Sequence, residues 1–234
     1  MRQGARLYSY SEALKFINST LMIGIGMGIL VSMVASLLVN LATWLSNYRG
    51  VMDENLPQLS IFGGSIVPML WLIAAAFVLW FIRKSFGISR WHGPADSIYG
   101  AHRLDNEIDT KAGFASTLAA FVSMGSGAPV GQYGPLVHFG ATVGCFFRKL
   151  FDTKIIGVDV FIGCGVAAAI AAGFSAPIAG IVFAHEAILR HFSFRALAPI
   201  AIASITSAWL SDRVFGGTPV FIVEATVPDL LPMV

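Results

Sequence analysis

Long stretches without a charged side chain alternate with short polar segments along this chain of 234 residues. A membrane-spanning helix needs about 20 consecutive, mostly apolar residues. Four of the stretches are long enough, and a fifth, shorter one is expected to be tilted or to cross only in part. They lie between Lys15 and Arg49, Glu54 and Arg83, Lys111 and Arg148, Asp159 and Glu186, and Arg195 and Asp212. This series excludes a soluble protein and predicts an all-α integral membrane protein that crosses the membrane several times.

The same pattern predicts where the helices lie. The expected spans and polar segments of the first half are a span at 16–46, a polar loop at 47–60, a span at 62–82 and a polar segment at 85–111. The expected helices that follow are shorter, at 111–123, 134–150, 157–172, 177–190 and 196–214. Glycine and proline separate them at 124–133 and 173–177. Because irregular backbone at membrane depth is tolerated only where protein buries it or a wet cavity adjoins it, such breaks indicate a transport site.

Polarity divides the chain into an amino-terminal segment, 1–15, and a membrane domain, 16–234. Lysine and arginine are frequent in the amino-terminal segment, at 83–111 and at 190–195. The positive-inside rule places these segments in the cytoplasm. A basic cluster at 148–154 goes against this simple count.

Composition supports the membrane assignment and limits the partners. Charged residues make up 12% of the chain, whereas a soluble domain has about 25%. A net charge of +2 without a run of basic residues gives no indication of a nucleic-acid partner. Cys145 and Cys164 lie in apolar stretches and are expected to be buried hydrophobic residues rather than a disulfide. Membrane lipid is therefore the partner that the composition implies.

The segment Gly131-Gln132-Tyr133-Gly134-Pro135 is the main candidate for chemistry. Proline fits the first turn of a helix, where its missing N–H is no loss. A helix start also carries partial positive charge and unsatisfied N–H donors, so it attracts an anion without burying a full basic charge in the membrane. The alternative, which these residues leave open, is a glycine-proline helix break that serves packing alone.

Residues 131–141 read G-x-x-G-P-x-V-x-x-G-A and resemble the G-[KR]-E-G-P-x-V motif of the CLC chloride channel and chloride–proton antiporter family. About 40 residues later, residues 173–183 resemble the F-N-A-P-[LI]-A-G-x-x-F segment of that family, in the same register. Residues 98–101 match the end of its G-S-G-I-P-E-x-x-G-A motif, and 217–231 resemble the loop before its second half. The resemblance spans nearly the whole chain.

This resemblance implies the amino-terminal half of an inverted-repeat CLC-type fold with broken, tilted helices. It implies no enzyme activity and no cofactor, with chloride as the transported ion. In the family the central anion lies between broken helices of both halves, so a second CLC half is the expected partner. Residues 1–234 alone are then expected to give no selective anion flux. Complete subunits are expected to form a homodimer in a plasma membrane, such as a bacterial inner membrane.

Three departures from the family pattern shape the expected mechanism. The gating glutamate of the family aligns with Tyr133, whose phenol is neutral at physiological pH. The inner proton-transfer glutamate of the antiporters aligns with Ala187, directly after Glu186. The chloride-contacting serine aligns with Gly93, or, after a shift of one residue, Asp96 matches the glutamate of the same motif. With both family carboxylates replaced, we expect passive, channel-like transport of chloride or a similar monovalent anion, without proton coupling.

The expected anion path is lined by Gly131, Gln132, Tyr133, Gly134, Gly93 and Asp96, with Tyr133 as the gate and Glu186 and Ala187 at the inner vestibule. The alternative is a non-conducting CLC-like membrane protein with a structural or interaction role, in which Tyr133 marks a degenerate pore. A zinc site of the His-Glu-x-x-His type is excluded because position 189 is Leu189. His138 is expected to be a hydrogen-bonded interior residue rather than a ligand.

Overall fold

The computed structural model describes residues 10–55, 60–61, 64–103, 108–131, 133–151 and 156–216. Its elements, in chain order, are α1 (Tyr10–Asn55), β1 (Ser60–Ile61), β2 (Gly64–Ser65), α2 (Val67–Phe86), α3 (Pro94–His102), α4 (Thr110–Gly125), α5 (Tyr133–Leu150), α6 (Val158–Phe174), α7 (Pro177–Phe183), the π-helix η1 (Ala184–Leu189) and α8 (Phe194–Phe215). Two strands of two residues each form a small antiparallel pair. The described chain is otherwise helical, so the all-α prediction is confirmed.

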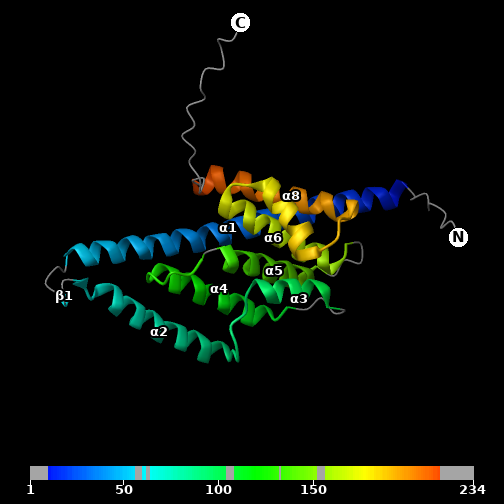
Figure 1. Cartoon of the computed structure of the whole chain (residues 1–234). Helices are drawn as coiled ribbons and strands as arrows, with labels where there is room; N and C mark the ends of the chain where they lie inside the picture. The colour runs from blue at the N-terminus through cyan, green and yellow to red at the C-terminus, as the bar shows by residue number, and fades with distance from the viewer. Residues whose placement is uncertain are drawn as a thin grey trace, which may run out of the picture.

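Helix α6 lies at the centre of the helical layers (Figure 1). Helix α5 packs along one side of it, and α1 and α8, which run beside each other, pack on another side. Helix α4 packs against α5, and α2 covers the outer side of α4. Helix α3 contacts both α5 and η1, which brings its start close to the start of α5.

Helix α1 is longer than the charge pattern predicts. It begins at Tyr10 rather than at 16 and continues to Asn55, so most of the polar loop expected at 47–60 is helical. Polar side chains such as Asp53 and Glu54 do not end a helix by themselves, and the next helix-breaking residue in the sequence is Pro57. At 46 residues α1 is about 69 Å long, more than twice the thickness of a hydrocarbon core.

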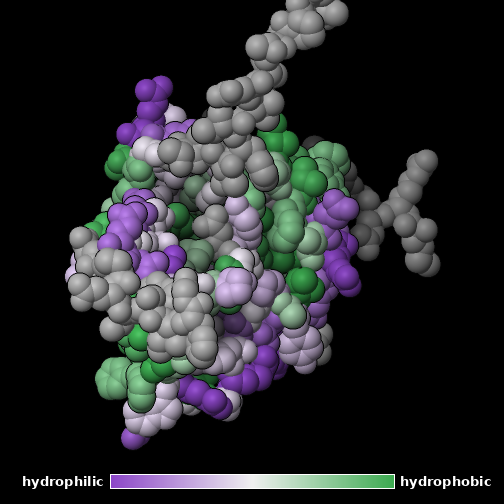
Figure 2. Space-filling view, turned by 60° about the vertical axis from the view of Figure 1, so that its left-hand side comes forward, coloured by the Kyte–Doolittle hydropathy of each residue, from purple (hydrophilic) through white to green (hydrophobic). Residues whose placement is uncertain are grey.

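Three described helices are long and apolar enough to cross a membrane, and they cover Leu14–Glu54, Val67–Phe86 and Phe194–Phe215. The third contains the shortest of the five charge-free stretches and extends beyond it at both ends, so the helix of 22 residues is long enough to span, and its tilt stays a prediction. The other charge-free stretches are divided, as the glycine and proline breaks predict, into α4 and α5 and into α6 and α7. Hydrophobic and hydrophilic residues both occur on the face of the molecule shown in Figure 2.

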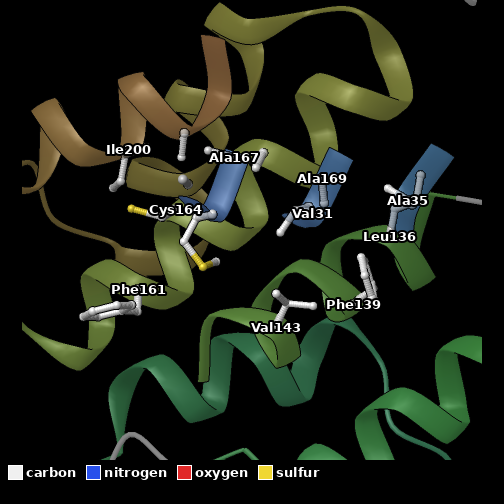
Figure 3. Close-up of a cluster of buried hydrophobic side chains, with 14 of the residues drawn as sticks. Val31, Ala35, Leu136, Phe139, Val143, Phe161, Cys164, Ala167, Ala169 and Ile200 are labelled. Carbon is white, nitrogen blue, oxygen red and sulfur yellow. The ribbon is translucent and has the colours of Figure 1, made fainter. Parts of the chain in front are cut away.

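The core lies between α1, α5, α6 and α8 (Figure 3). Residues 160–171 of α6 are all buried, so this helix meets protein on every side. Glycines allow its backbone to touch that of α5, since a methyl group built on Gly140 would overlap the carbonyl oxygen of Gly165, and the reverse also holds. Phe139, Phe161 and Ile200 fill the space around this contact.

A row of serines joins α8 to α6 and α7. Ser207 Oγ donates to the carbonyl oxygen of Ala168 at 2.7 Å, and Ser211 Oγ donates to that of Ala172 at 3.2 Å. Ser204 Oγ donates to the Pro177 carbonyl oxygen at 2.8 Å. Interhelical hydrogen bonds of this kind satisfy polar backbone groups where no water is available. The sequence analysis did not predict them.

The first testable prediction concerns the contact between α5 and α6. Replacing Gly165→Ala forces the two backbones apart, because the new methyl group overlaps backbone atoms that cannot move independently. We expect a loss of stability of about 1–3 kcal/mol, measured as a lower thermal unfolding midpoint in detergent. Gly50→Ala on α1 is the matched control, because a methyl group there meets nothing within 4 Å. Equal unfolding midpoints for the two variants would contradict the prediction.

Candidate functional site

The candidate site is built around the start of α5. Tyr133 is the first residue of this 18-residue helix, followed by Gly134 and Pro135. A proline in the first turn removes no intrahelical hydrogen bond, because the first N–H groups of a helix have no partner within it. Gly131 is exposed just before the helix, and Gln132 lies outside the described residues. The predicted helix start at this motif is therefore confirmed.

The start of α3 touches the start of α5. Gly93 precedes α3, and Pro94 is its first residue. A methyl group built on Gly134 would lie 3.3 Å from Cγ of Pro94, so glycine permits this close approach. Two helix starts, each with partial positive charge, therefore converge at one place. The helix α3 itself lies within the segment 85–111, for which only polar sequence was predicted.

Asp96 folds back onto the start of its own helix. Its Oδ2 accepts a hydrogen bond from the Gly93 N–H at 2.9 Å, and Arg90 Nη1 donates to the same oxygen at 3.3 Å. Burial raises the pKa of Asp96, but the hydrogen bonds and charge of Arg90 and the Gly93 N–H outweigh it, so the pKa lies below the ordinary aspartate value. One of the free donors at the start of α3 is thus already used, and the carboxylate is balanced by a cation.

Two histidines adjoin this convergence. His138 of α5 is buried, its Nδ1 lies 2.8 Å from Ser97 Oγ, and its Nε2 has no hydrogen-bond partner. The His92 ring lies 5.9 Å from the His138 ring, and the His92 N–H donates to Ser116 Oγ at 2.8 Å. His138 is therefore hydrogen-bonded and interior, as predicted. The sequence analysis missed Ser97 and Arg90, because nothing in the sequence relates them to residues brought near by folding.

Tyr133 is held by an aromatic contact. Its ring stacks on Phe174 with a centroid separation of 3.8 Å and an angle of 20° between the ring planes. Phe174 is the last residue of α6, and Ser175 after it adopts the left-handed conformation at φ 52°. Ser175 Oγ donates to Asp212 Oδ1 at 2.9 Å, which ties this turn to α8. The side chain proposed as the gate thus contacts the break between α6 and α7.

Glu186 and Ala187 do not belong to the helices whose starts form the candidate site. Both belong to η1, the π-helical continuation of α7. Glu186 is exposed and lines a cavity of about 470 Å³ to which no residue from the starts of α3 and α5 contributes. Among the described residues, no group of three or more histidine, cysteine, aspartate or glutamate side chains could hold a metal ion.

Fold and site together define a class: a multi-pass membrane protein of broken helices, in which two helix starts meet. The sequence profile described as "Voltage gated chloride channel" matches residues 74–234. The chain therefore belongs to the voltage-gated chloride channel family, also called the CLC family. This is a family of chloride channels rather than of enzymes, and it has bacterial members.

The curated relatives include proteins described as voltage-gated ClC-type chloride channel ClcB. The one from Shigella flexneri is 31% identical over 167 residues, which are 71% of this chain and 39% of that protein. The one from Yersinia pseudotuberculosis serotype I is 24% identical over 169 residues, 72% of this chain and 40% of that protein. The chain therefore spans about two fifths of the length of these relatives.

A solved structure shares the fold. The crystal structure of a slow cyanobacterial Cl⁻/H⁺ antiporter matches 85% of this chain and 47% of that chain, with a TM-score of 0.67 and 18% sequence identity. This likeness confirms the predicted fold class, a CLC-type arrangement of apolar helices. The roles of Tyr133, Ala187 and the other candidate site residues stay predictions.

The second testable prediction concerns the cap of α3. Asp96→Ala removes the acceptor of the Gly93 N–H, which is expected to lower stability by about 0.5–2 kcal/mol at neutral pH. The pKa of Asp96 is lowered in the folded protein. The carboxylate therefore contributes its full stabilisation of the fold above the ordinary aspartate pKa of about 3.9, and this stabilisation is lost as the pH falls through the pKa of the folded state. Thermal unfolding of both proteins at neutral and acidic pH measures this.

Asp96→Asn is the matched variant, because it keeps an acceptor but cannot titrate. Its stability should lie between those of the other two proteins at neutral pH. A wild type and an Asp96→Ala variant that unfold at the same temperature at neutral pH would show that the cap contributes nothing.

Proposed function

We propose that the chain forms part of a pathway by which chloride, or a similar monovalent anion, crosses the membrane passively. The observation that supports this most directly is the contact between the starts of α3 and α5 at Pro94 and Gly134. Helix starts attract anions through N–H groups and the helix dipole. They do so without a buried side-chain cation, which is costly inside a membrane.

The start of α5 is the better of the two as an anion site. At α3, the carboxylate of Asp96 already accepts from the Gly93 N–H. Its charge is balanced by Arg90, so the pair adds little net repulsion. At α5, by contrast, the helix begins with Tyr133-Gly134 and carries no acidic residue in its first turn. Gly131, Gln132, Tyr133 and Gly134 are therefore proposed as the anion-binding segment, and Gly93 and Asp96 as its supporting wall.

The absence of proton coupling is proposed from the residue types along the path. Tyr133 stands where the family has its gating glutamate, and Ala187 where the antiporters have their inner glutamate. Neither side chain carries a carboxylate that takes up and releases protons at physiological pH. Glu186 is proposed to line the inner vestibule without acting as that carrier.

A second CLC half is proposed as the partner that completes the pore. The relatives named above are about two and a half times as long as the segment they share with this chain. In an inverted-repeat transporter the binding site lies at the interface of the repeats. The proposed pore therefore needs helix starts from both halves, and complete subunits are proposed to pair as homodimers.

The second candidate function is a non-conducting membrane subunit. This candidate is supported by the stack of Tyr133 on Phe174, which places two aromatic rings in close contact beside the start of α5, where they would obstruct an anion. If this contact is permanent, the protein has a structural or interaction role. Anion flux distinguishes the two candidates.

The third testable prediction is anion flux without proton movement. Vesicles that contain the protein assembled with its second half, a chloride gradient and a potassium ionophore to balance the charge should release chloride without a change in internal pH. The physical reason is that Tyr133 and Ala187 offer no exchangeable carboxylate proton. A fixed ratio of protons to chloride would contradict the uncoupled mechanism, and no flux above that of empty vesicles would favour the non-conducting subunit.

The fourth testable prediction concerns the gate. Tyr133→Ala removes the ring that stacks on Phe174 and should raise chloride flux several-fold, because a desolvating anion then meets no aromatic obstruction. Phe174→Ala should raise flux in the same direction, and the double variant should gain less than the product of the two, since both changes release one contact. Chloride efflux per inserted protein is the measurement.

Tyr48→Ala, which removes a tyrosine from the end of α1, is the matched control and should leave the flux unchanged. A Tyr133→Ala variant that inserts normally and conducts less than the wild type would show that the phenol is a ligand rather than an obstruction.

A further inference from the structure

The end of α2 carries a cavity that the proposed anion pathway does not use. It has a volume of about 330 Å³ and is lined by Trp80, Arg83, Lys84, Gly87 and Ile88. Two of these side chains are basic, and none of the five is acidic. Gly87 ends the helix in the left-handed conformation at φ 65°, and its N–H donates to the Lys84 carbonyl oxygen at 3.3 Å. The chain therefore folds back against the last turn, so that the loop and the helix end form the cavity together.

The position of this cavity along α2 matches the edge of a membrane. Helix α2 is one of the helices that can cross a membrane, and its 20 residues make it about 30 Å long, which equals the thickness of a hydrocarbon core. Its charged residues, Arg83 and Lys84, both lie in its last turn. The cavity thus lies where hydrocarbon gives way to lipid headgroups. By the positive-inside rule, this end of α2 is expected to face the cytoplasm.

Both basic side chains are held in place without an acidic partner. Arg83 Nε donates to the Ile88 carbonyl oxygen at 3.2 Å, and its Nη2 donates to that of Ser89 at 2.7 Å. Lys84 Nζ lies 5.0 Å from the centroid of the Trp80 ring. Within the described residues, no carboxylate forms an ion pair with either side chain. The cavity therefore carries two positive charges that the described part of the chain does not neutralise.

An exposed aromatic stripe leads along α2 to this cavity. Phe77, Trp80 and Phe81 are each more than half exposed. Together with Lys84 they follow the spacing i, i+3, i+4 and i+7, so the four side chains share one face of the helix. Phenylalanine suits contact with hydrocarbon, and tryptophan is enriched at the level of the headgroups. One face of α2 therefore offers an apolar surface that ends in a positively charged cavity.

We propose that this cavity binds the headgroup phosphate of an anionic phospholipid in the adjoining leaflet. Arg83 Nη1 and Lys84 Nζ donate no hydrogen bond to a described residue, so they supply both charge and N–H donors for the phosphate. An acyl chain of the same lipid lies along Phe77 and Phe81. The occupant is a lipid rather than free phosphate, because only a lipid uses both the charged cavity and the apolar stripe beside it.

The charges of the cavity decide which lipids it prefers. A phosphatidylglycerol headgroup carries one negative charge, which the two cations attract. In phosphatidylcholine the same phosphate is joined to a quaternary ammonium, which the two cations repel. An aromatic ring can bind such an ammonium, but Lys84 already lies over the Trp80 ring. The site therefore favours anionic over zwitterionic lipids.

The experiment counts the lipids bound to the purified full chain in detergent by native mass spectrometry. The protein is titrated with dioleoyl phosphatidylglycerol and, separately, with dioleoyl phosphatidylcholine, which has the same acyl chains and phosphate but no net charge. The wild type should bind phosphatidylglycerol at several-fold lower concentration, and the difference should shrink as the salt concentration rises. Inorganic phosphate, added as a competitor, should not displace phosphatidylglycerol because it cannot use the aromatic stripe.

Variants of exposed side chains make the test specific without disturbing the fold. Lys84→Gln should weaken phosphatidylglycerol binding about fivefold, the effect of one basic residue near a membrane surface, and leave phosphatidylcholine binding unchanged. Lys84→Arg should restore the preference, and Phe81→Ala should weaken the binding of both lipids. Arg213→Gln is the matched control, since Arg213 also lies in the last turn of a spanning helix but does not line the cavity.

A preference for phosphatidylglycerol that is lost in Lys84→Gln, restored in Lys84→Arg and kept in Arg213→Gln would support the proposal. Equal binding of the two lipids by the wild type would overturn it, as would displacement by inorganic phosphate, which would assign the cavity to a free oxyanion. A preference that disappears once the second half is assembled would show that protein, not lipid, covers this face. None of these outcomes depends on whether the protein conducts.

Discussion

Gly140 and Gly165 bring the backbones of α5 and α6 into direct contact, and much of the described structure depends on that contact. It places α6 so deep that residues 160–171 are all buried. It also fixes α5, whose start then meets α3 at Gly134. Larger side chains would separate the two helices and move the start of α5, so the geometry of the candidate site follows from packing some distance along the same helix.

A membrane protein with broken helices must satisfy the backbone groups that each break exposes, because the hydrocarbon offers no water. Here Ser211 of α8 donates to the carbonyl oxygen of Ala172, in the last turn of α6 before the break. Asp96 accepts the first free N–H at α3. The start of α5 is different, since its first turn carries glycine, proline and a stacked tyrosine rather than a capping carboxylate. The proposed anion site rests on this difference between α3, whose first turn carries Asp96, and α5, whose first turn carries no acidic residue.

Two kinds of polar site thus occur on one scaffold. At the helix starts, the positive potential comes from backbone dipoles, which do not titrate and cost little to bury. At the end of η1, Arg190 and Glu186 line an open cavity, where water lowers the cost of charge. The first arrangement suits an anion that passes without protons.

The sequence by itself determined the membrane class, the approximate positions of most helices and the broken start at Tyr133-Gly134-Pro135, because charge-free length, glycine and proline act locally along the chain. It misplaced both ends of α1 because a helix can continue through polar residues until a breaking residue occurs. Only the tertiary structure decided that Asp96 is held by Arg90, that Tyr133 stacks on Phe174 and that His185 and His191 share a cavity. The first and the last of these arrangements depend on how the chain turns in a short segment. The stack of Tyr133 on Phe174 joins residues 41 positions apart through the packing of α5 on α6, which no local pattern encodes.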